Sequence, residues 1–300
     1  MGCKIYPRMA SVSIIIPVLN RAQYLPRLFR SIACVDYEDL EVVLVDNGST
    51  DGSLSLCRSF AEDAPMVVRV LEEARPGACQ ARNHGLAQCQ TEWVYFFDSD
   101  DELSAIFLQE VMPRATGDYD LIAFPTRLEQ EGRLRTRAFV KSSSVSAQIL
   151  SATLNTQGML FRTDFLRAIG GWDARLAVWQ DWELGVRALL AGPRMLWLDR
   201  RAYHTIHIHP DSITGPSMAS RREERNLTLD VVAGQLNTAA AHRALYLRRC
   251  ILNGMLEREG TRPLLLGRSI GWCIRLYGTL LQHYTALGGR GAWRLANIVC

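Results

Sequence analysis

The sequence lacks the features that would place it in a specialised class of protein. No stretch reaches the roughly 18 uninterrupted apolar residues of a membrane-spanning helix, and residues 1–9 contain no apolar segment of the secretory type. None of the eight cysteines lies in a C-x-x-C pair, which argues against a zinc knuckle or a disulfide framework. The 300 residues are 48% apolar and 22% charged, as in ordinary globular proteins. We therefore expect a cytoplasmic protein of one large domain or two small ones.

Charge is unevenly distributed along the chain. Residues 1–220 hold 22 basic and 26 acidic side chains, a net charge of −4, whereas residues 221–300 hold 12 and 5, a net charge of +7. A mildly acidic body argues against nucleic-acid binding. The tail mixes leucines and aromatic residues with arginines over residues 264–287. Such helices pack on their own domain or, alternatively, rest on the inner face of the cell membrane.

Short apolar runs recur through the first half at a spacing of about 30 residues, the size of a βαβ unit. They are rich in β-branched and aromatic residues, which is typical of buried strands. The runs cover residues 12–18, 42–45, 67–71, 93–97 and 121–124, with helical periodicity over 24–32, 54–60, 78–89 and 104–114. The pattern predicts an α/β fold with a mostly parallel sheet and helices on both faces.

The second half predicts a different organisation. A short apolar segment at 159–161 leads into a helix that Gly170 and Gly171 would end. A further helix of about three turns is expected to begin at Asp181 and to end near Gly192. Beyond Gly215 the pattern is helical and basic, so we predict a body over residues 1–215 and a helical region over 216–300.

Polar residues directly follow three of the predicted strands. Ligands of an open parallel sheet bind beyond the carboxyl ends of its strands, and these ends carry Asn20, Asp46-Asn47 and Asp98-Ser99-Asp100-Asp101. Neither a G-x-G-x-x-G turn nor a P-loop is present. Three carboxylates within four residues repel one another, and a bound hard divalent cation would neutralise them and attract a diphosphate. The alternative is a solvated turn that caps the next helix.

Several of these segments together resemble the family 2 glycosyltransferases of the GT-A fold. The resemblance lies in SIIIPVLN (13–20), VDNGSTD (45–51), GACQARNHG (77–85), FFDSDD (96–101), and GGWD (170–173) followed by QDWEL (180–184). It runs in order from about residue 12 to residue 214. It implies a nucleotide-binding half over about 1–124 and an acceptor half over about 125–215.

The resemblance implies inverting transfer of a sugar from a nucleoside diphosphate donor to a hydroxyl group, with Mn²⁺ or Mg²⁺. Asp181 matches the catalytic base that takes the acceptor proton. Asp100 matches the metal-binding aspartate, with Asp101 in support and His209 as a further ligand. The nucleotide-binding positions would be Pro17, Leu19, Asn20, Asp46, Asn47, Arg82, Asp98 and Ser99.

Each of three assignments has a structural alternative. Asp181 could instead be a helix N-cap, Arg82 a surface arginine, and His209 a structural imidazole. A zinc site is not expected, because strand alternation leaves only His207 and His209 on one face.

Two positions depart from the family pattern. Gln180 stands where many members have an acidic residue, so a neighbouring carboxylate would not assist the base there. Asn47 stands where many have the second of two aspartates. Because an amide both donates and accepts hydrogen bonds, this position does not predict which nucleobase the donor carries.

The leading hypothesis is a transferase of bacterial surface polysaccharide or glycolipid synthesis that acts on a glycan or lipid-linked acceptor. One alternative is a sugar nucleotidyltransferase, although the segment after the first strand is not a glycine-rich basic loop. The other is a catalytically degenerate module that binds nucleotide sugars.

Overall fold

The computed structural model describes residues 10–137, 139–208, 219–266 and 271–298. The chain divides into two compact units that interleave along the sequence. The first unit comprises Met1–Thr136, Thr156–Trp172 and Pro193–His207. The second comprises Arg137–Asn155, Asp173–Gly192 and Ile208–Cys300. The boundary predicted at residues 215–216 lies outside the described residues.

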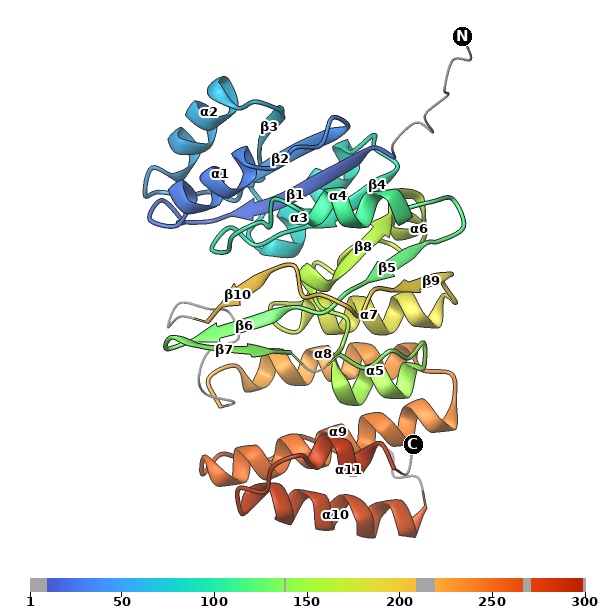
Figure 1. The fold of residues 1–300 in the computed structure, drawn as a ribbon. Helices are drawn as coiled ribbons and strands as arrows, with labels where there is room; N and C mark the ends of the chain where they lie inside the picture. Colours follow the sequence, from blue (N-terminus) through green and yellow to red (C-terminus); the bar gives the residue numbers. More distant parts are fainter. Residues whose placement is uncertain (1–9, 138, 209–218, 267–270, 299–300) are drawn as a thin grey trace. The chain divides into compact units, whose positions relative to one another are not determined.

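A seven-stranded sheet forms the centre of the first unit (Figure 1). Its order is β3-β2-β1-β4-β8-β5-β9. The strands are β1 (Val12–Val18), β2 (Leu40–Asp46), β3 (Val67–Glu72), β4 (Trp93–Phe96), β5 (Leu121–Ala123), β8 (Met159–Arg162) and β9 (Met195–Trp197). All neighbouring pairs are parallel except those of β8, which runs antiparallel to β4 and to β5. The mostly parallel sheet predicted from the sequence is confirmed.

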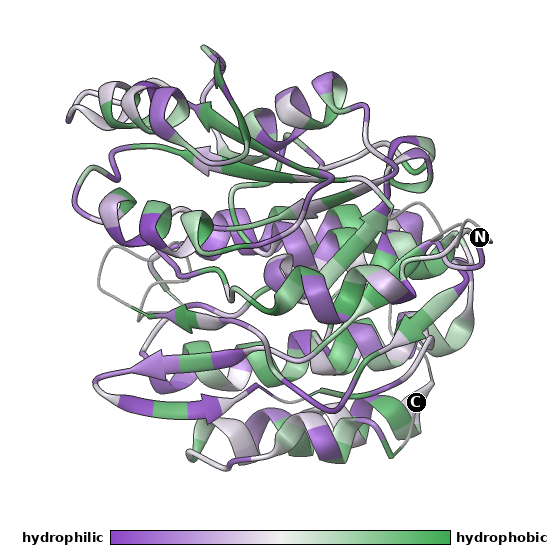
Figure 2. Cartoon of the chain, turned by 45° about the horizontal axis from the view of Figure 1, so that its top comes forward, coloured by the Kyte–Doolittle hydropathy of each residue, from purple (hydrophilic) through white to green (hydrophobic). Residues whose placement is uncertain are grey.

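Alternation along β1 explains why helices cover both faces of the sheet. Ile14 and Ile16 belong to one core cluster with Leu28 of the first helix. Ile15 points to the other face, where a Cβ added to Gly85 would lie 2.6 Å from it, so only glycine lets that helix approach so closely. The helices of this unit are α1 (Leu25–Ala33), α2 (Ser53–Asp63), α3 (Ala78–Gln88), α4 (Phe107–Val111) and α6 (Thr163–Ala168). Figure 2 shows the central strands as largely hydrophobic.

Two elements of the first unit differ from the prediction. Strand β3 is not buried, because it lies at the edge of the sheet, where β2 is its one strand partner among the described residues; Val67 is 61% exposed. The helix expected over residues 104–114 is shorter, since α4 ends at Val111 and continues as the 3-10 turn η1 (Met112–Arg114). Pro113 lacks the N–H that a continuing α-helix requires.

A small second sheet in the first unit contains β6 (Arg127–Gln130), β7 (Arg133–Thr136) and β10 (Thr205–His207), in the order β10-β6-β7. Strand β7 is exposed along its whole length, which agrees with the alternating arginines of its sequence. Strand β10 places His207 beside the carboxylate-rich loop after β4, as described below.

The second unit is helical. It contains α5 (Val145–Ser151), α7 (Gln180–Leu190), α8 (Arg222–Gln235), α9 (Ala239–Arg258), α10 (Trp272–Ala286) and α11 (Ala292–Ala296). Helix α9 is the most buried of these and contributes more core residues than any other helix of the unit. Helix α10 packs against it closely, because a Cβ at Gly254 would lie 2.3 Å from the backbone oxygen of Gln282. Within the described residues, no helix combines the length and apolar character needed to cross a bilayer.

Candidate active site

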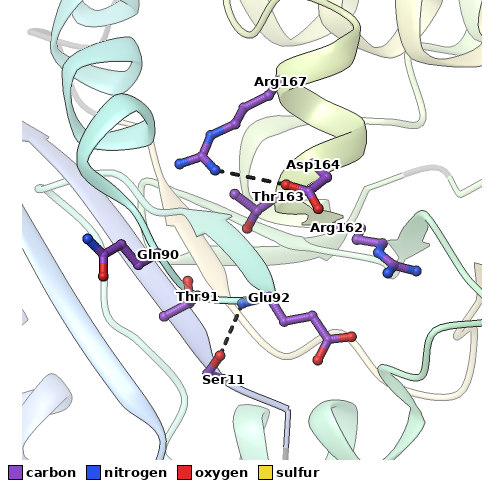
Figure 3. A pocket seen from close by; sticks show the side chains of 8 residues that line it. All are labelled: Ser11, Gln90, Thr91, Glu92, Arg162, Thr163, Asp164 and Arg167. Carbon is purple, nitrogen blue, oxygen red and sulfur yellow. Dashed lines mark hydrogen bonds and ion pairs between the residues drawn. The ribbon is translucent and has the colours of Figure 1, made fainter.

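A cavity of about 440 Å³ opens at the amino ends of the central strands (Figure 3). Ser11 precedes β1 and its hydroxyl oxygen accepts a hydrogen bond from the Glu92 N–H, just before β4. The wall is polar and is formed by Ser11, Gln90, Thr91, Glu92, Arg162, Thr163, Asp164 and Arg167. This cavity contains none of the predicted site residues. Ligands of open α/β sheets bind at the opposite edge, beyond the carboxyl ends of the strands. The predicted site residues that follow β1, β2 and β4 lie at that edge.

At the carboxyl end of β2, Asp46 organises a tight turn. Its Oδ2 accepts hydrogen bonds from the backbone N–H groups of Gly48 (3.1 Å) and Ser49 (3.0 Å). The side chain is almost fully buried, and its Oδ1 has no hydrogen-bond partner among the described residues. A buried acceptor without a partner is uncommon in folded proteins. Asp46 therefore offers an acceptor that a ligand could use.

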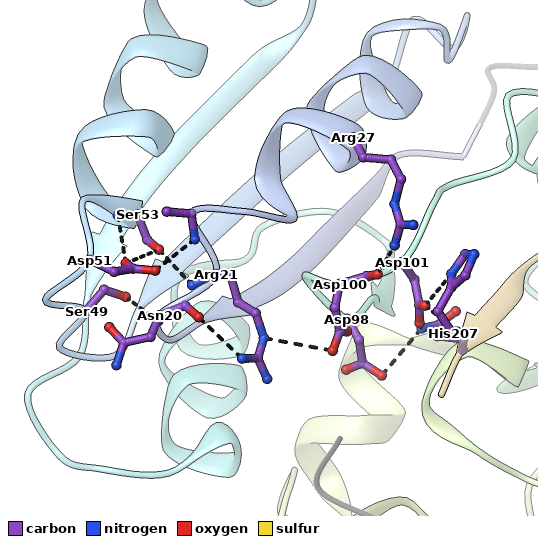
Figure 4. A network of polar contacts seen from close by, with 12 residues as sticks. Asn20, Arg21, Arg27, Ser49, Asp51, Ser53, Asp98, Asp100, Asp101 and His207 are labelled. Atoms are coloured by element: carbon purple, nitrogen blue, oxygen red, sulfur yellow. Dashed lines mark hydrogen bonds and ion pairs between the residues drawn. The ribbon is translucent and has the colours of Figure 1, made fainter. Parts of the chain in front are cut away.

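The loop after β1 is joined to this turn (Figure 4). Asn20 has a left-handed backbone (φ 51°), and its Oδ1 accepts a hydrogen bond from the Thr50 N–H at 2.8 Å. The Asn20 N–H in turn donates to Ser49 Oγ at 3.0 Å. Leu19 is 46% exposed, and Pro17 is half-buried in β1. These contacts hold the ends of β1 and β2 together as one edge.

Asn47 has a structural function that the sequence did not reveal. Its Nδ2 donates to the backbone oxygens of Glu73 and Arg75, both at 2.8 Å, and its Oδ1 accepts from the Gly77 N–H at 2.8 Å. The aspartate common at this position in the family could not make the two donations. The amide thus fixes the segment from β3 to α3, and its contact with a nucleotide stays a prediction.

Arg82 is buried, so its interpretation as a surface arginine is wrong. Its guanidinium lies 4.5 Å from the ring centroid of Trp172 and donates to Asp98 Oδ1 at 2.9 Å. Burial raises the pKa of Asp98 to about 6; Arg82 opposes this shift, while Asp100 and Asp101 add to it. Helix α3 and the loop after β4 are therefore coupled through a charged pair, and Ser99 is buried in that loop.

Asp101 is held in place by residues far away in the sequence. Its Oδ1 accepts from the His207 N–H at 2.7 Å and lies 3.1 Å from His207 Nδ1. Its Oδ2 accepts from the side chain of Gln157, the middle residue of the 3-10 turn η2 (Thr156–Gly158). Burial raises the pKa of Asp101 against the effect of these hydrogen bonds, and the bond to Asp101 raises the pKa of His207.

Asp100 lies between Arg21, which precedes α1, and Arg27 of α1 (Figure 4). Arg21 Nε is 3.8 Å from Asp100 Oδ2, and Arg27 donates to the Asp100 backbone oxygen. Among the described residues, no three His, Cys, Asp or Glu side chains gather into a metal site by themselves. His209 lies outside the described residues. The carboxylate oxygens of Asp98 and Asp100 nevertheless suit Mg²⁺ or Mn²⁺, which commonly combine one or two carboxylates with phosphate oxygens and water.

Asp181 belongs to the second unit, in the first turn of α7. The capping position is Trp179, which has a left-handed backbone (φ 54°), so the interpretation of Asp181 as the N-cap is wrong. Asp181 Oδ1 accepts from the Trp182 N–H at 2.8 Å, and the side chain is half-buried. A carboxylate in a first helical turn is favoured by the helix dipole. Gln180 donates to the Leu176 backbone oxygen.

Behind this turn lies a buried arginine that the sequence analysis missed. Arg248 of α9 has its guanidinium 4.3 Å from the ring centroid of Trp182, 5.0 Å from that of Trp179 and 5.1 Å from that of Trp293. It donates to the Ile149 backbone oxygen at 2.7 Å. Burial lowers the pKa of Arg248 to about 9, and Asp181 acts in the opposite direction. Arg248 of α9 therefore stabilises the first turn of α7 through its contacts with the rings of Trp179 and Trp182.

Comparison with known proteins identifies the family. The model of the family "Glycosyl transferase family 2" matches residues 13–168, which is more than half of the chain. A relative from Campylobacter jejuni, named GalNAc(5)-diNAcBac-PP-undecaprenol beta-1,3-glucosyltransferase, is 32% identical over 127 residues. That match covers 42% of this chain and 41% of the relative, so the similarity spans about two fifths of either protein.

Two solved structures share the fold. TarS 1-349 of S. aureus, crystallised with UDP-GlcNAc, aligns with a TM-score of 0.65 at 17% identity, covering 96% of this chain and 90% of that one. Mannosyltransferase PcManGT from Pyrobaculum calidifontis, in complex with GDP-Man and Mn²⁺, aligns with a TM-score of 0.60 at 18% identity, covering 97% and 88%. The expected GT-A fold is confirmed, and the chain is a glycosyltransferase of family 2.

Proposed function

We propose that this glycosyltransferase inverts the configuration of a sugar that it moves from a nucleoside diphosphate donor to a hydroxyl acceptor. The observation that carries the proposal is the group of carboxylates at the carboxyl end of β4. The same edge of the sheet carries Asp46 at the end of β2, whose Oδ1 has no hydrogen-bond partner among the described residues. This is the edge where an open sheet binds nucleotides. Asn20, Asp46, Arg82 and Asp98 are the proposed donor-binding residues, together with Pro17, Leu19, Asn47 and Ser99.

Asp100 is the proposed ligand of a divalent cation, Mn²⁺ or Mg²⁺. The ion, when bound, supplies positive charge that stabilises the departing nucleoside diphosphate. Asp101 already accepts hydrogen bonds from His207 and Gln157, so its proposed part is to support the loop that carries Asp100. His209 remains a predicted ligand. The PcManGT complex with Mn²⁺ supports the use of a metal on this fold.

Asp181 is the proposed base. It takes the proton of the acceptor hydroxyl while that oxygen bonds to the anomeric carbon of the sugar. The bond from that carbon to the diphosphate oxygen breaks in the same step, and the nucleoside diphosphate leaves with the bonding electrons. A single displacement of this kind inverts the configuration, and a positioned base typically contributes 10²–10⁴-fold.

The proposed acceptor is a glycan or lipid-linked saccharide of bacterial surface polysaccharide or glycolipid synthesis. The name of the Campylobacter relative, which specifies an undecaprenol-linked acceptor, supports this class. A cytoplasmic protein at the inner face of the cell membrane would meet such an acceptor. Because the fold neighbours were solved with UDP-GlcNAc and with GDP-Man, both nucleotide types belong in the test.

The first experiment measures stabilisation by nucleotides. Thermal unfolding of the wild type is followed with UDP, GDP, ADP and CDP, each with and without Mn²⁺. We expect one base to stabilise the protein, with Mn²⁺ enhancing the effect. Asp100→Ala should lose the Mn²⁺-dependent part, whereas Asp164→Ala, whose side chain is 87% exposed on α6, should behave as wild type. If Mn²⁺ enhanced the nucleotide-dependent stabilisation equally in both variants, Asp100 would not be a metal ligand.

The second experiment measures catalysis with the nucleotide sugar identified by the first. Slow release of nucleoside diphosphate in Mn²⁺ indicates a transferase, whereas consumption of nucleoside triphosphate with sugar phosphate would indicate a nucleotidyltransferase. Asp181→Asn should lower transfer about 10³-fold while the nucleotide-dependent stabilisation stays unchanged. Normal turnover in this variant would show that another group is the base.

A further inference from the structure

Helix α10 is apolar on two sides, and within the described part of the chain only one of these sides is buried. On the inner side, Gly278, Leu281 and Thr285 are buried. Gly278 approaches Cys250 of α9, because an added Cβ would lie 2.8 Å from its sulfur. In Figure 1, α10 runs alongside α9 within the helical unit. This inner side accounts for the attachment of α10, and it leaves the outer side to be explained.

The outer side carries a row of exposed apolar residues, with the exposed polar residues Thr279 and His283 beside them. Trp272 is 75% exposed, Leu276 54%, Leu280 58%, Tyr284 41% and Leu287, at the end of the helix, 90%. Steps of four, four, four and three residues place these side chains along one side of an α-helix. We call this strip the outer α10 face. A helix face that contacts only solvent usually carries mostly polar residues. Contiguous exposed apolar patches commonly mark interaction sites.

The charge around this face selects the partner. After Glu259 the sequence contains no Asp or Glu, and five arginines follow, at positions 262, 268, 275, 290 and 294. Arg275, Arg290 and Arg294 are exposed. Glu257 of α9 accepts a hydrogen bond from Gln282 of α10, whereas α10 itself contains Arg275 and no Asp or Glu. An apolar strip with Trp and Tyr on such a helix suits the interface of an anionic bilayer, where rings and leucines enter the acyl boundary and arginines contact headgroups.

A second copy of the chain fits this surface less well. A two-fold contact places the same patch on both sides, so each outer α10 face would meet the other with its own arginines. Residues 260–300 supply no carboxylate to neutralise them, and Glu257, the α9 carboxylate that contacts α10, already accepts a hydrogen bond from Gln282. A membrane supplies the missing negative charge and tolerates an unpaired apolar strip.

We propose that the outer α10 face docks this protein on anionic phospholipid membranes. The helix would lie in the plane of the interface, with Trp272, Leu276 and Leu280 inserted and Arg275 at headgroup level. This proposal concerns attachment and goes beyond the transfer reaction. Its test therefore needs no substrate, and donor hydrolysis can succeed or fail independently of it.

The experiment is co-flotation of the purified full-length protein with vesicles of phosphatidylcholine alone or with 30% phosphatidylglycerol, at low and high salt. We expect binding to the anionic vesicles, weaker binding at high salt, and at least a tenfold loss in Leu276→Glu/Leu280→Glu. The matched control is Leu134→Glu/Leu227→Glu, which places the same two charges at leucines that are 56% and 44% exposed elsewhere. It should float as wild type.

Two further measurements keep the result interpretable. Circular dichroism and thermal unfolding of both variants show whether they fold, and gel filtration shows whether the wild type dimerises. Absence of wild-type flotation at low salt would overturn the proposal. So would undiminished flotation of a folded Leu276→Glu/Leu280→Glu, or a wild-type dimer that this variant dissociates without any lipid binding.

Discussion

Each of the two units buries a basic side chain among aromatic rings. At neutral pH one of these side chains is neutral and the other is positively charged. In the first unit, His204 is fully buried next to Phe107, Phe97 and Tyr95, with ring centroids 4.6, 5.2 and 5.7 Å away. In the second, Arg248 lies among three tryptophans. Burial lowers the pKa of His204 to about 3 and that of Arg248 to about 9.

The same physical effect therefore leads to two outcomes at neutral pH. Desolvation disfavours the charged form of both groups, but histidine begins near pH 6.5 and arginine above pH 12. His204 is neutral, and its Nδ1 accepts from the Ser104 N–H at 3.3 Å. Arg248 keeps its charge and needs partners for it, which the Ile149 oxygen and the faces of the tryptophans provide. The stability that His204 provides should therefore depend on pH. The stability that Arg248 provides should depend on its partners and on the volume of its side chain.

The largest expected effect is that of Arg248→Ala. It empties the space among three indole rings and removes the charge, so we expect the free energy of unfolding to fall by about 3 kcal/mol or more. Arg248→Met is the matched variant, because it retains most of the volume and the Ile149 oxygen still accepts from Trp182 Nε1 at 3.3 Å. The apolar side chain avoids the cost of removing a charge from water, so we expect a loss below about 1 kcal/mol. Urea unfolding measures both. Equal losses would mean that the charge, and not the volume, provides the stabilisation.

His204 provides a pH-dependent effect of intermediate size. Its unfolded form takes up a proton below about pH 6.5, whereas the native form does so only near pH 3. Stability from this group is therefore complete above pH 6.5 and falls by about 1.4 kcal/mol per pH unit as the pH decreases toward 3. From pH 7 to pH 5 the loss is about 2 kcal/mol.

The test compares urea unfolding of the wild type and His204→Phe at both pH values. Phenylalanine suits the aromatic cluster but leaves the Ser104 N–H without its acceptor, which costs about 1–2 kcal/mol at either pH. The informative quantity is consequently the change between pH 7 and pH 5, which should be about 2 kcal/mol smaller in the variant. An identical change in both proteins would mean that His204 is protonated in the native state.

These contacts also show where inference from the sequence stops. The strands at 12–18, 42–45 and 93–97, and the polar residues after them, could be predicted because short apolar runs and the positions that follow them are local features. The burial of β3 was predicted wrongly, since an edge strand carries the same valine-rich pattern as a central one.

Contacts between distant residues have no local signal. Gln157 reaches Asp101 across 56 residues, and Arg248 reaches Ile149 across 99. Asn47 could be recognised as unusual in its family, but its three hydrogen bonds to the segment after β3 depend on the fold. In the same way, the two units interleave, and no composition change in the sequence marks the points where the chain passes between them.

A buried cation of the first unit sharpens the comparison, because Arg82 stacks on Trp172 and also has a carboxylate partner, Asp98. Arg82→Met should cost about 1 kcal/mol, since the Asp98 side chain is 32% exposed and water screens the pair. It should also weaken nucleotide-dependent stabilisation, if Asp98 binds the donor as proposed. The control is Arg58→Met, which removes an exposed pair with Glu72 and should match the wild type in both measurements. If nucleotides stabilised Arg82→Met as much as the wild type, the Arg82–Asp98 pair would not contribute to donor binding.

The smallest expected effect is that of Trp182→Phe, which separates the two contributions of one ring to the Arg248 environment. Phenylalanine retains an aromatic face for the guanidinium but is the weaker partner, and it removes the Nε1 donation to the Ile149 oxygen. That oxygen keeps its stronger, charged donor at 2.7 Å, so no buried acceptor is left unpaired. We expect a loss of about 1 kcal/mol in wild type, measured by urea unfolding. The same substitution in an Arg248→Met background should cost more, about 1–3 kcal/mol, because Trp182 Nε1 is then the side-chain donor that the buried Ile149 oxygen has left. A double-mutant cycle gives the coupling energy between the two side chains. No measurable loss in wild type would show that Trp182 only fills space beside Arg248.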